Sequence, residues 1–255
     1  MENRIIELVS SASCDVYPDN TLSTFTNLLP EQIHFEGQWE VALLEISYPT
    51  NYHNITDGRY TIEDTKADVR LFGRISAGIY HSVTEIIERI HENSVLLWHN
   101  KKEPFMIEWE ILRESKKLLF RMQRGIRMKF TSDDISQVLG FTKDQWITNV
   151  VVSSYPINIP RIHSIMLYTD IVEYSIVGDV KVPLLRSFPF TAKFKQDIAP
   201  IQYMSYMSFD NLQFRRLLKN NFHSITIEAR TVTGELIPFA AIGSTRVTLL
   251  FRKIS

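Results

Sequence analysis

The chain has 255 residues, of which 44% are hydrophobic and 22% charged, and its formal net charge is -1. This composition is typical of a globular protein with a large core and excludes a disordered chain. A near-neutral charge gives no global field for nucleic acid or an acidic membrane, so any such binding needs a local patch. Cys14 is the only cysteine, which excludes an intrachain disulfide and a cysteine-based metal cage.

The first fifty residues predict three strands separated by turns. Residues 4–11 and 22–29 form the first two, and the second is expected to stop at Pro30, because proline lacks the N–H that strand pairing uses. Residues 38–47 carry apolar side chains on both faces, which is typical of a strand inside a sheet rather than at its edge.

Residues 59–146 predict an α/β insertion with two short helices. Ser82 and Glu85 have the spacing of a capping box, in which the two residues satisfy each other's exposed backbone N–H groups. Ser132 is expected to cap the second helix, which ends at Gly140. The apolar side chains of the first helix follow at helical spacing, at Val83, Ile86, Ile87 and Ile90.

The last thirty residues indicate how the fold closes. Residues 223–230 alternate strictly between apolar and polar side chains, and residues 246–252 alternate again, with Val247, Leu249 and Phe251 on one face. This pattern predicts two strands that each bury one face. A strand that comes this late is best accommodated between strands that already exist. The pattern therefore predicts a closed β-sandwich.

Four segments resemble the minor capsid (penton) protein of Polinton, or Maverick, elements, which are virus-like transposons of eukaryotes related to virophage-type penton proteins. The segments are SCDVYPDN (13–20), WEVALLEISYP (39–49), VPLLR (182–186) and VTLLFRK (247–253). They lie in the right order toward both ends of the chain, so the resemblance covers most of it. Cys14 stands where Met or another apolar residue is expected, and Leu250 where His is expected.

The resemblance implies a single jelly roll that forms pentameric vertices of an icosahedral shell. Together with the strand pattern it gives a fold class: mainly β, a single jelly-roll β-sandwich with an α/β insertion. The sandwich would comprise residues 1–58 and 147–255, and the insertion residues 59–146.

The expected function is that of a structural capsid protein, not an enzyme, with no cofactor and no metal. The seven histidines show no metal-site spacing, and no nucleotide-binding or hydrolase motif is present. The expected partners are further copies in a homopentamer and the major capsid protein, but no membrane. The expected location is a virion or virus-like particle, made in the host cytoplasm or nucleus and not secreted, because the start of the chain lacks a signal-peptide pattern. The alternatives are a ligand-binding, lectin-like jelly roll and a β-sandwich enzyme with converging histidines and carboxylates.

Two surfaces are candidates for contact with partners. The first is rich in aromatic residues and methionine, which are enriched in interface cores, although core packing would explain it equally well. It comprises Tyr203, Met204, Tyr206, Met207 and Phe209.

The second candidate surface is basic and lies around a predicted hairpin of residues 105–122. It would contact packaged DNA or an acidic neighbouring subunit. The alternative is a solvated hairpin, because only Phe120 and Phe130 supply aromatic surface nearby. The basic residues are Arg113, Lys116, Lys117, Arg121, Arg124, Arg127 and Lys129.

Overall fold

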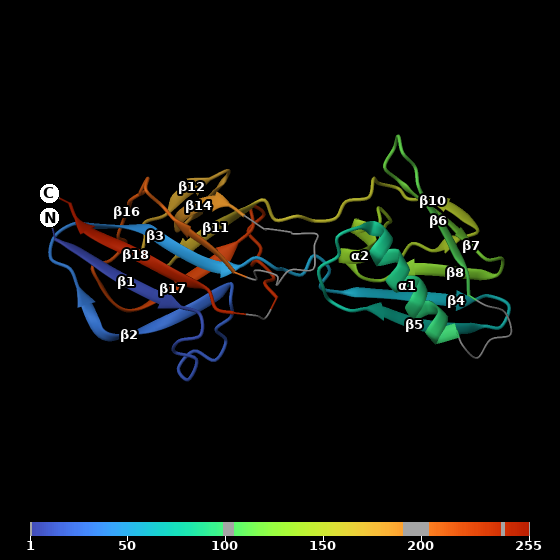
Figure 1. Ribbon diagram of the computed structural model, residues 1–255, viewed down its shortest axis with the longest axis horizontal. Helices are drawn as coiled ribbons and strands as arrows, with labels where there is room; N and C mark the ends of the chain where they lie inside the picture. The colour runs from blue at the N-terminus through green and yellow to red at the C-terminus, as the bar shows by residue number, and fades with distance from the viewer. Residues whose placement is uncertain (1, 99–104, 191–203, 241–242, 255) are drawn as a thin grey trace. The chain divides into compact units, whose positions relative to one another are not determined.

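The computed structural model describes residues 2–98, 105–190, 204–240 and 243–254 (Figure 1). The chain divides into two compact units. The jelly-roll unit comprises Met1–Tyr52 and Ile162–Ser255, and the inserted unit comprises His53–Arg161. No helix of the described residues is long and apolar enough to cross a membrane.

The first sheet of the jelly-roll unit has the strand order β1-β18-β3-β15, with antiparallel pairing throughout. The short strand β16 also pairs with β3. The late strand β18 therefore lies between two earlier strands, as its place in the chain predicts. Its apolar side chains at 247, 249 and 251 are buried, as its alternation predicts. The strands are β1 (Asn3–Val9), β3 (Trp39–Pro49), β15 (Met204–Ser208), β16 (Arg215–Arg216) and β18 (Arg246–Lys253).

The second sheet has the order β14-β11-β17-β2 and is also antiparallel. Its strands are β2 (Thr24–His34), β11 (Ser164–Thr169), β14 (Leu184–Pro189) and β17 (Asn221–Arg230). A separate hairpin joins β12 (Ser175–Val177) to β13 (Val180–Val182).

The prediction that the second strand stops at Pro30 is wrong, because β2 continues to His34. Two features make the proline tolerable. β2 is the edge strand of its sheet, and Pro30 lies where its pairing with β17 shifts register. At such a position the missing N–H leaves no neighbouring carbonyl without its partner.

The order of the strands in the two sheets defines the fold. Among the described residues, and apart from β16 and the β12–β13 hairpin, this unit has eight strands. In chain order, strands one, eight, three and six form one sheet, and strands five, four, seven and two form the other. This is a jelly roll. The predicted fold class is therefore confirmed, and both sheets bury one shared core that includes Val41, Leu43, Leu167, Ile225 and Phe251.

In its described residues the inserted unit contains two antiparallel sheets and two helices, shown at the right of Figure 1. One sheet has the order β5-β4-β8-β9 and the other β10-β7-β6. The elements are β4 (Gly58–Asp64), β5 (Val69–Ile75), α1 (Val83–Trp98), β6 (Ile107–Ile111), β7 (Leu118–Met122), β8 (Ile126–Phe130), α2 (Asp133–Val138), β9 (Ile147–Thr148) and β10 (Val150–Val152).

Helix α1 begins with one of the two bonds of the predicted capping box. The Ser82 hydroxyl accepts the Glu85 N–H at 3.1 Å, but the Glu85 carboxylate accepts the N–H of His81, at 2.9 Å, rather than that of Ser82. Every member of the apolar stripe is buried. The helix covers the inner face of the β4 sheet, where the Tyr60 hydroxyl donates to the carbonyl of Ile90.

Helix α2 differs from its prediction at one end. Ser132 does not cap it through its side chain, because the hydroxyl donates instead to the carbonyl of Asp57 at 2.5 Å. The other end agrees with the sequence. Gly140 has a φ of 75°, and the Phe141 N–H closes the last turn on the Ser136 carbonyl at 2.8 Å.

The boundaries of the inserted unit lie outside residues 59–146, the range that the sequence indicates. Gly58 already belongs to β4, and Ile147 begins β9, which pairs with β8. Ile157 and Ile159 pack against the core of this unit. Residues 53–58 and 147–161 therefore belong with the insertion rather than with the sandwich.

Candidate interaction surfaces

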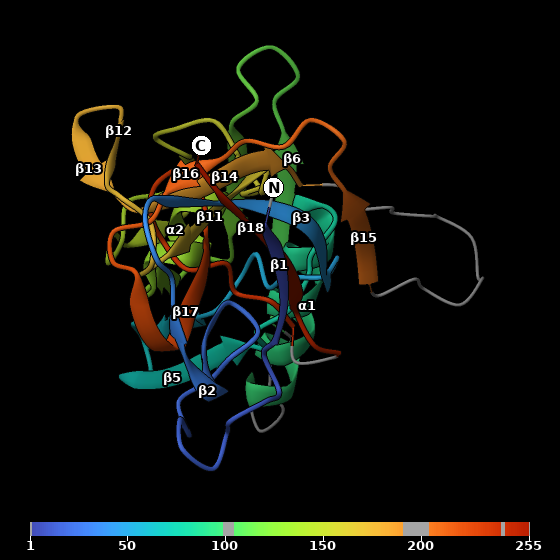
Figure 2. The ribbon, with the colours of Figure 1, turned by 90° about the vertical axis from the view of Figure 1, so that its left-hand side faces the viewer.

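The aromatic and methionine cluster lies around β15, the edge strand beside β3 (Figure 2). Tyr203 lies outside the described residues. Met207 and Phe209 pack against the core of the jelly-roll unit. The Tyr48 hydroxyl donates to the Met207 sulfur at 3.6 Å. These two side chains therefore contribute to the protein's own packing.

Phe209 is held from two sides. Its ring lies edge-on to Phe188 at 5.6 Å between centroids, and the Arg186 guanidinium lies 3.9 Å from its centroid. Arg186 is itself nearly buried and donates to the carbonyl of Asn211 at 2.8 Å. Burial lowers the pKa of Arg186 below its ordinary value. The guanidinium lies over the Phe209 ring at this edge of the core.

Tyr206 is the member of the cluster that faces outward, with 64% of its surface exposed. A hydrogen bond with Glu45 on β3 raises the pKa of Tyr206 above its ordinary value. Met204 is half-buried. The predicted cluster is thus divided between core side chains and one exposed ring on a strand edge.

The opposite flank of the jelly-roll unit also exposes apolar side chains, which the sequence reasoning did not select. Ile5 on the edge strand β1 and Leu28 on the edge strand β2 are both exposed. The signal for Ile5 was present, because Ile5 and Ile6 are adjacent and adjacent side chains of a strand point to opposite faces.

The structure separates the seven basic residues into three groups. Arg113, Lys116 and Lys117 lie at the turn between β6 and β7. Arg121 on β7 faces Glu110 across the hairpin at 3.7 Å, and Arg124 lies in the turn before β8. Arg127 and Lys129 are on β8, in the other sheet of the unit.

The two basic residues of β8 have acidic and aromatic neighbours. Arg127 contacts Glu63 at 2.5 Å, and Lys129 contacts Asp144 at 3.1 Å. Both cations lie over the ring of Trp146, at 4.3 and 5.1 Å from its centroid. The sequence offers little indication of these ion pairs, because Glu63 lies 64 positions from Arg127 and Asp144 lies 15 positions from Lys129.

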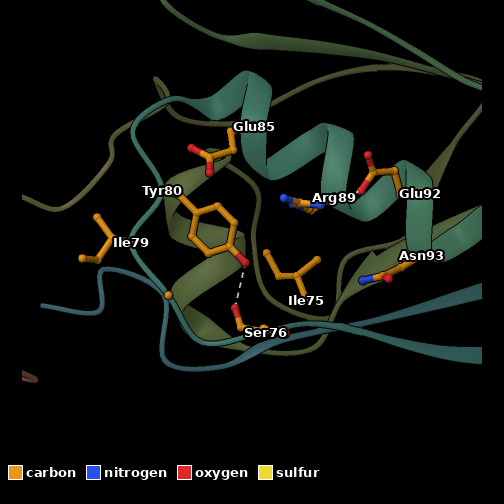
Figure 3. Close-up of a pocket in the computed structure, with 9 residues that line it drawn as sticks. Ile75, Ser76, Ile79, Tyr80, Glu85, Arg89, Glu92 and Asn93 are labelled. Carbon is orange, nitrogen blue, oxygen red and sulfur yellow. Dashed lines mark hydrogen bonds and ion pairs between the residues drawn. The ribbon is translucent and has the colours of Figure 1, made fainter. Parts of the chain in front are cut away.

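A pocket of about 370 Å³ opens between α1 and the segment after β5 (Figure 3). Its charged side chains have partners within the protein. Arg89 and Glu92 form an ion pair at 2.9 Å, and the Glu85 carboxylate accepts the backbone N–H of His81. The Tyr80 hydroxyl donates to the carbonyl of Ser76 at 2.7 Å, and burial raises its pKa.

The fold and surfaces define a jelly-roll protein that carries an inserted α/β unit between its third and fourth sandwich strands. Within the described residues no group of three or more His, Cys, Asp or Glu side chains is placed to hold a metal ion. No family model matches the sequence, and no curated protein matches it.

The solved structures that are similar to the chain include two of low sequence identity. The first is the selenomethionine-labelled mavirus penton protein, with 12% identity over 99% of this chain and 100% of that one, and a TM-score of 0.44. The second comprises the D2-D3 domains of the flagellar cap protein FliD from Escherichia coli, with 10% identity over 89% of this chain and 100% of that one, and a TM-score of 0.23. Both TM-scores are too low to establish a shared fold.

Proposed function

We propose that this protein is a structural capsid protein that forms the pentameric vertices of an icosahedral virus-like particle, of the Polinton and virophage type. The observation that carries the proposal is the strand order of the two sheets. The jelly roll is an architecture of viral capsid proteins, although lectins and cupins share it. The number five and the link to Polinton elements come from the sequence resemblance.

The segments that carry the resemblance have structural roles in this unit, which supports the proposal. In the first segment, the Ser13 hydroxyl accepts the Leu28 N–H at 3.0 Å. The Asn20 side chain donates to the Ala12 carbonyl and accepts the Thr26 N–H. These bonds fix the connection between β1 and β2.

The second and last segments form the centre of the first sheet. They correspond to β3 and most of β18, and Val41 of one lies opposite Phe251 of the other. The segments that resemble the penton proteins thus fall on the sandwich itself.

We propose that copies associate through their strand edges. One flank carries β15 with the exposed Tyr206, and the other carries β1 and β2 with Ile5 and Leu28. A closed ring needs a heterologous interface, in which one surface meets a different surface of the next copy. Two opposite flanks with apolar side chains supply such a pair. The further proposed partner is the major capsid protein, and the proposed location is the virion or virus-like particle.

Native mass spectrometry of the full chain tests the assembly, with Tyr206→Arg as the variant. Arginine can pair with Glu45 and keep β15 in place, while it removes the aromatic ring from the flank. If Tyr206 is central to the interface, the variant should weaken association by about 2 kcal/mol, or roughly thirtyfold. Tyr174→Arg is the matched control, because Tyr174 is 59% exposed but lies beside the β12–β13 hairpin.

Wild type and control should give a pentamer mass, and Tyr206→Arg should give a larger monomer fraction at equal concentration. A wild-type protein that stays monomeric at high concentration, or that forms a trimer, contradicts the vertex proposal. Equal dissociation of the two variants would instead remove Tyr206 from the interface.

A further inference from the structure

The outer face of the β5-β4-β8-β9 sheet exposes Phe72 and several arginines, whereas Thr61 and Glu63 at its centre are buried. The inner face packs on α1 and the unit's core, whereas the alternate side chains of each strand point outward. The outward side chains are Arg59, Thr61 and Glu63 on β4, Arg70, Phe72 and Arg74 on β5, and Arg127 and Lys129 on β8.

The register arranges these side chains in three rows across the strands. The first row pairs Arg59 with Arg74, and the third places Glu63 between Arg70 and Arg127. The middle row contains Phe72, Thr61 and Lys129, and the ring of Trp146 lies beyond it, below the β8 cations. An aromatic row is therefore flanked by arginines on both sides.

Positive charge exceeds negative charge on this face. Its five basic side chains meet three carboxylates: Asp57 pairs with Arg59, Glu63 with Arg70 and Arg127, and Asp144 with Lys129. Among the described residues, no carboxylate lies within ion-pair distance of Arg74. Like charges directly opposite each other on a sheet are destabilising. The Asp57 carboxylate, which pairs with Arg59 and also attracts Arg74, offsets part of the repulsion between these two arginines, and a bound anion would offset more of it.

The aromatic row supplies a second, independent feature. Phe72 is 73% exposed in the middle of a strand, where an apolar ring gains nothing from solvent. Trp146 lies about three strand spacings away, or roughly 14 Å. A hollow of about 300 Å³ lies in front of Phe72, with Arg59, Arg70 and Lys129 in its lining.

We propose that this face binds single-stranded nucleic acid, with a base stacked on Phe72 and phosphates held by Arg59, Arg74 and Lys129. Every base has a flat face that can stack on an aromatic side chain, and the phosphates match a donor-rich surface. RNA-recognition sheets bind single strands with this combination of a sheet face and exposed rings, which is an analogy of mechanism.

The chemistry of the face favours a single strand over two other polyanions. A duplex keeps its bases stacked on one another, so it leaves Phe72 without a partner. A sulfated polysaccharide meets the positive charge but offers no aromatic plane. Of the seven basic residues that the sequence singles out, only Arg127 and Lys129 lie on this face.

Fluorescence anisotropy of the full chain with a labelled oligothymidylate tests the proposal. Phe72→Ala should raise the Kd about tenfold, and Phe72→Trp should restore binding, because stacking on an aromatic ring is worth about that factor per base. Arg74→Ala should weaken binding and lower the slope of log Kd against log salt by about one. Tyr155→Ala is the matched control, since Tyr155 is an exposed aromatic elsewhere in the unit.

Parallel titrations with oligouridylate, duplex DNA and heparin identify the ligand. Tighter binding of either single strand than of duplex supports the proposal, and the two single strands separate DNA from RNA. No binding of oligothymidylate or oligouridylate at low salt overturns it. Equal binding of duplex or heparin, or binding that Phe72→Ala leaves unchanged, overturns it in favour of charge attraction alone. None of these results depends on ring assembly, so the vertex proposal is tested separately.

Discussion

Glu63 has an unusual position for a carboxylate on the outer face of a sheet. Only 7% of the residue is exposed, and it contacts Arg127 at 2.5 Å and Arg70 at 3.0 Å. Its hydrogen bond with Arg127 is the main cause that holds the pKa of Glu63 below its ordinary value, and the bond with Arg70 adds to it. One carboxylate therefore joins the first and third strands of the β5-β4-β8 ladder.

This arrangement predicts how acid affects the inserted unit. A carboxyl whose pKa is lowered by folding stabilises the folded state above its ordinary pKa. That contribution is lost as the pH falls through the lowered value, because the proton then displaces the arginine contacts. Glu63→Gln should be less stable than wild type at neutral pH, and its stability should fall less on acidification.

Denaturant unfolding at a series of pH values measures this effect, and Glu114→Gln is the control, because Glu114 lies exposed in the β6–β7 turn. Parallel stability curves for wild type and Glu63→Gln would show that the two arginines do not act through this carboxylate.

The contacts of Glu63 illustrate a limit of sequence reasoning at this scale. Arg127 lies 64 positions away in the chain, and neither residue's neighbours indicate the pairing. Ser132 shows a related failure. Its position suits a helix cap, but the Asp57 carbonyl competes for its hydroxyl, and that carbonyl comes from a different element.

At the scale of elements, β5 approaches β4 through a glycine. Gly73 lies opposite Tyr60, and a Cβ built on Gly73 would lie 2.2 Å from the Tyr60 ring. Tyr60 is buried, and its hydroxyl donates to the Ile90 carbonyl of α1. The ring therefore has little room to retreat, and the missing side chain lets sheet and helix pack together.

Gly73→Ala should lower the free energy of unfolding by about 1–3 kcal/mol, which is the usual cost of overpacking a core. Gly78→Ala is the matched control, since its Cβ would meet its nearest neighbour, the Tyr80 ring, at an ordinary 3.5 Å. Thermal or denaturant unfolding compares the two. An equal loss of stability in both variants would mean that the Tyr60 contact is not the cause.

Most elements could be predicted because their periodicity is local. The alternation in β17 and β18 and the helical stripe of α1 all indicate the correct structure and buried face. The outer face of the inserted sheet could not be predicted, since Arg59, Phe72 and Lys129 meet only through the pairing of three strands. The continuation of β2 past Pro30 likewise depends on its place at a sheet edge.

At the scale of the whole molecule, the two connections to the inserted unit leave the sandwich at one place. The Ile162 N–H donates to the Tyr52 hydroxyl at 3.1 Å, and Tyr52 is buried against Phe190. The sequence marks strands but not the sheet that each joins, which is why it places the boundaries several residues inside those of the structure.

Replacement of residues 53–161 by a short Gly-Ser linker should therefore leave a folded jelly roll. The two ends are already neighbours, and a short loop costs little additional entropy to close. A cooperative unfolding transition with a β-type circular dichroism spectrum is the expected result. The isolated segment of residues 53–161 is the companion sample. If neither folds alone, the two units do not have separate cores.

The position of β18 also has a consequence for the order in which the protein is made. Within the described residues, the only sheet partner of β1 is β18, which the ribosome synthesises after each of the other described strands. The inserted unit is one continuous segment, so it can fold before β18 is synthesised. During that time β1 has no strand to pair with. Chains emerging side by side on one messenger would then expose the same open strand edges, and the crowding of ribosomes would influence how often neighbouring copies pair incorrectly.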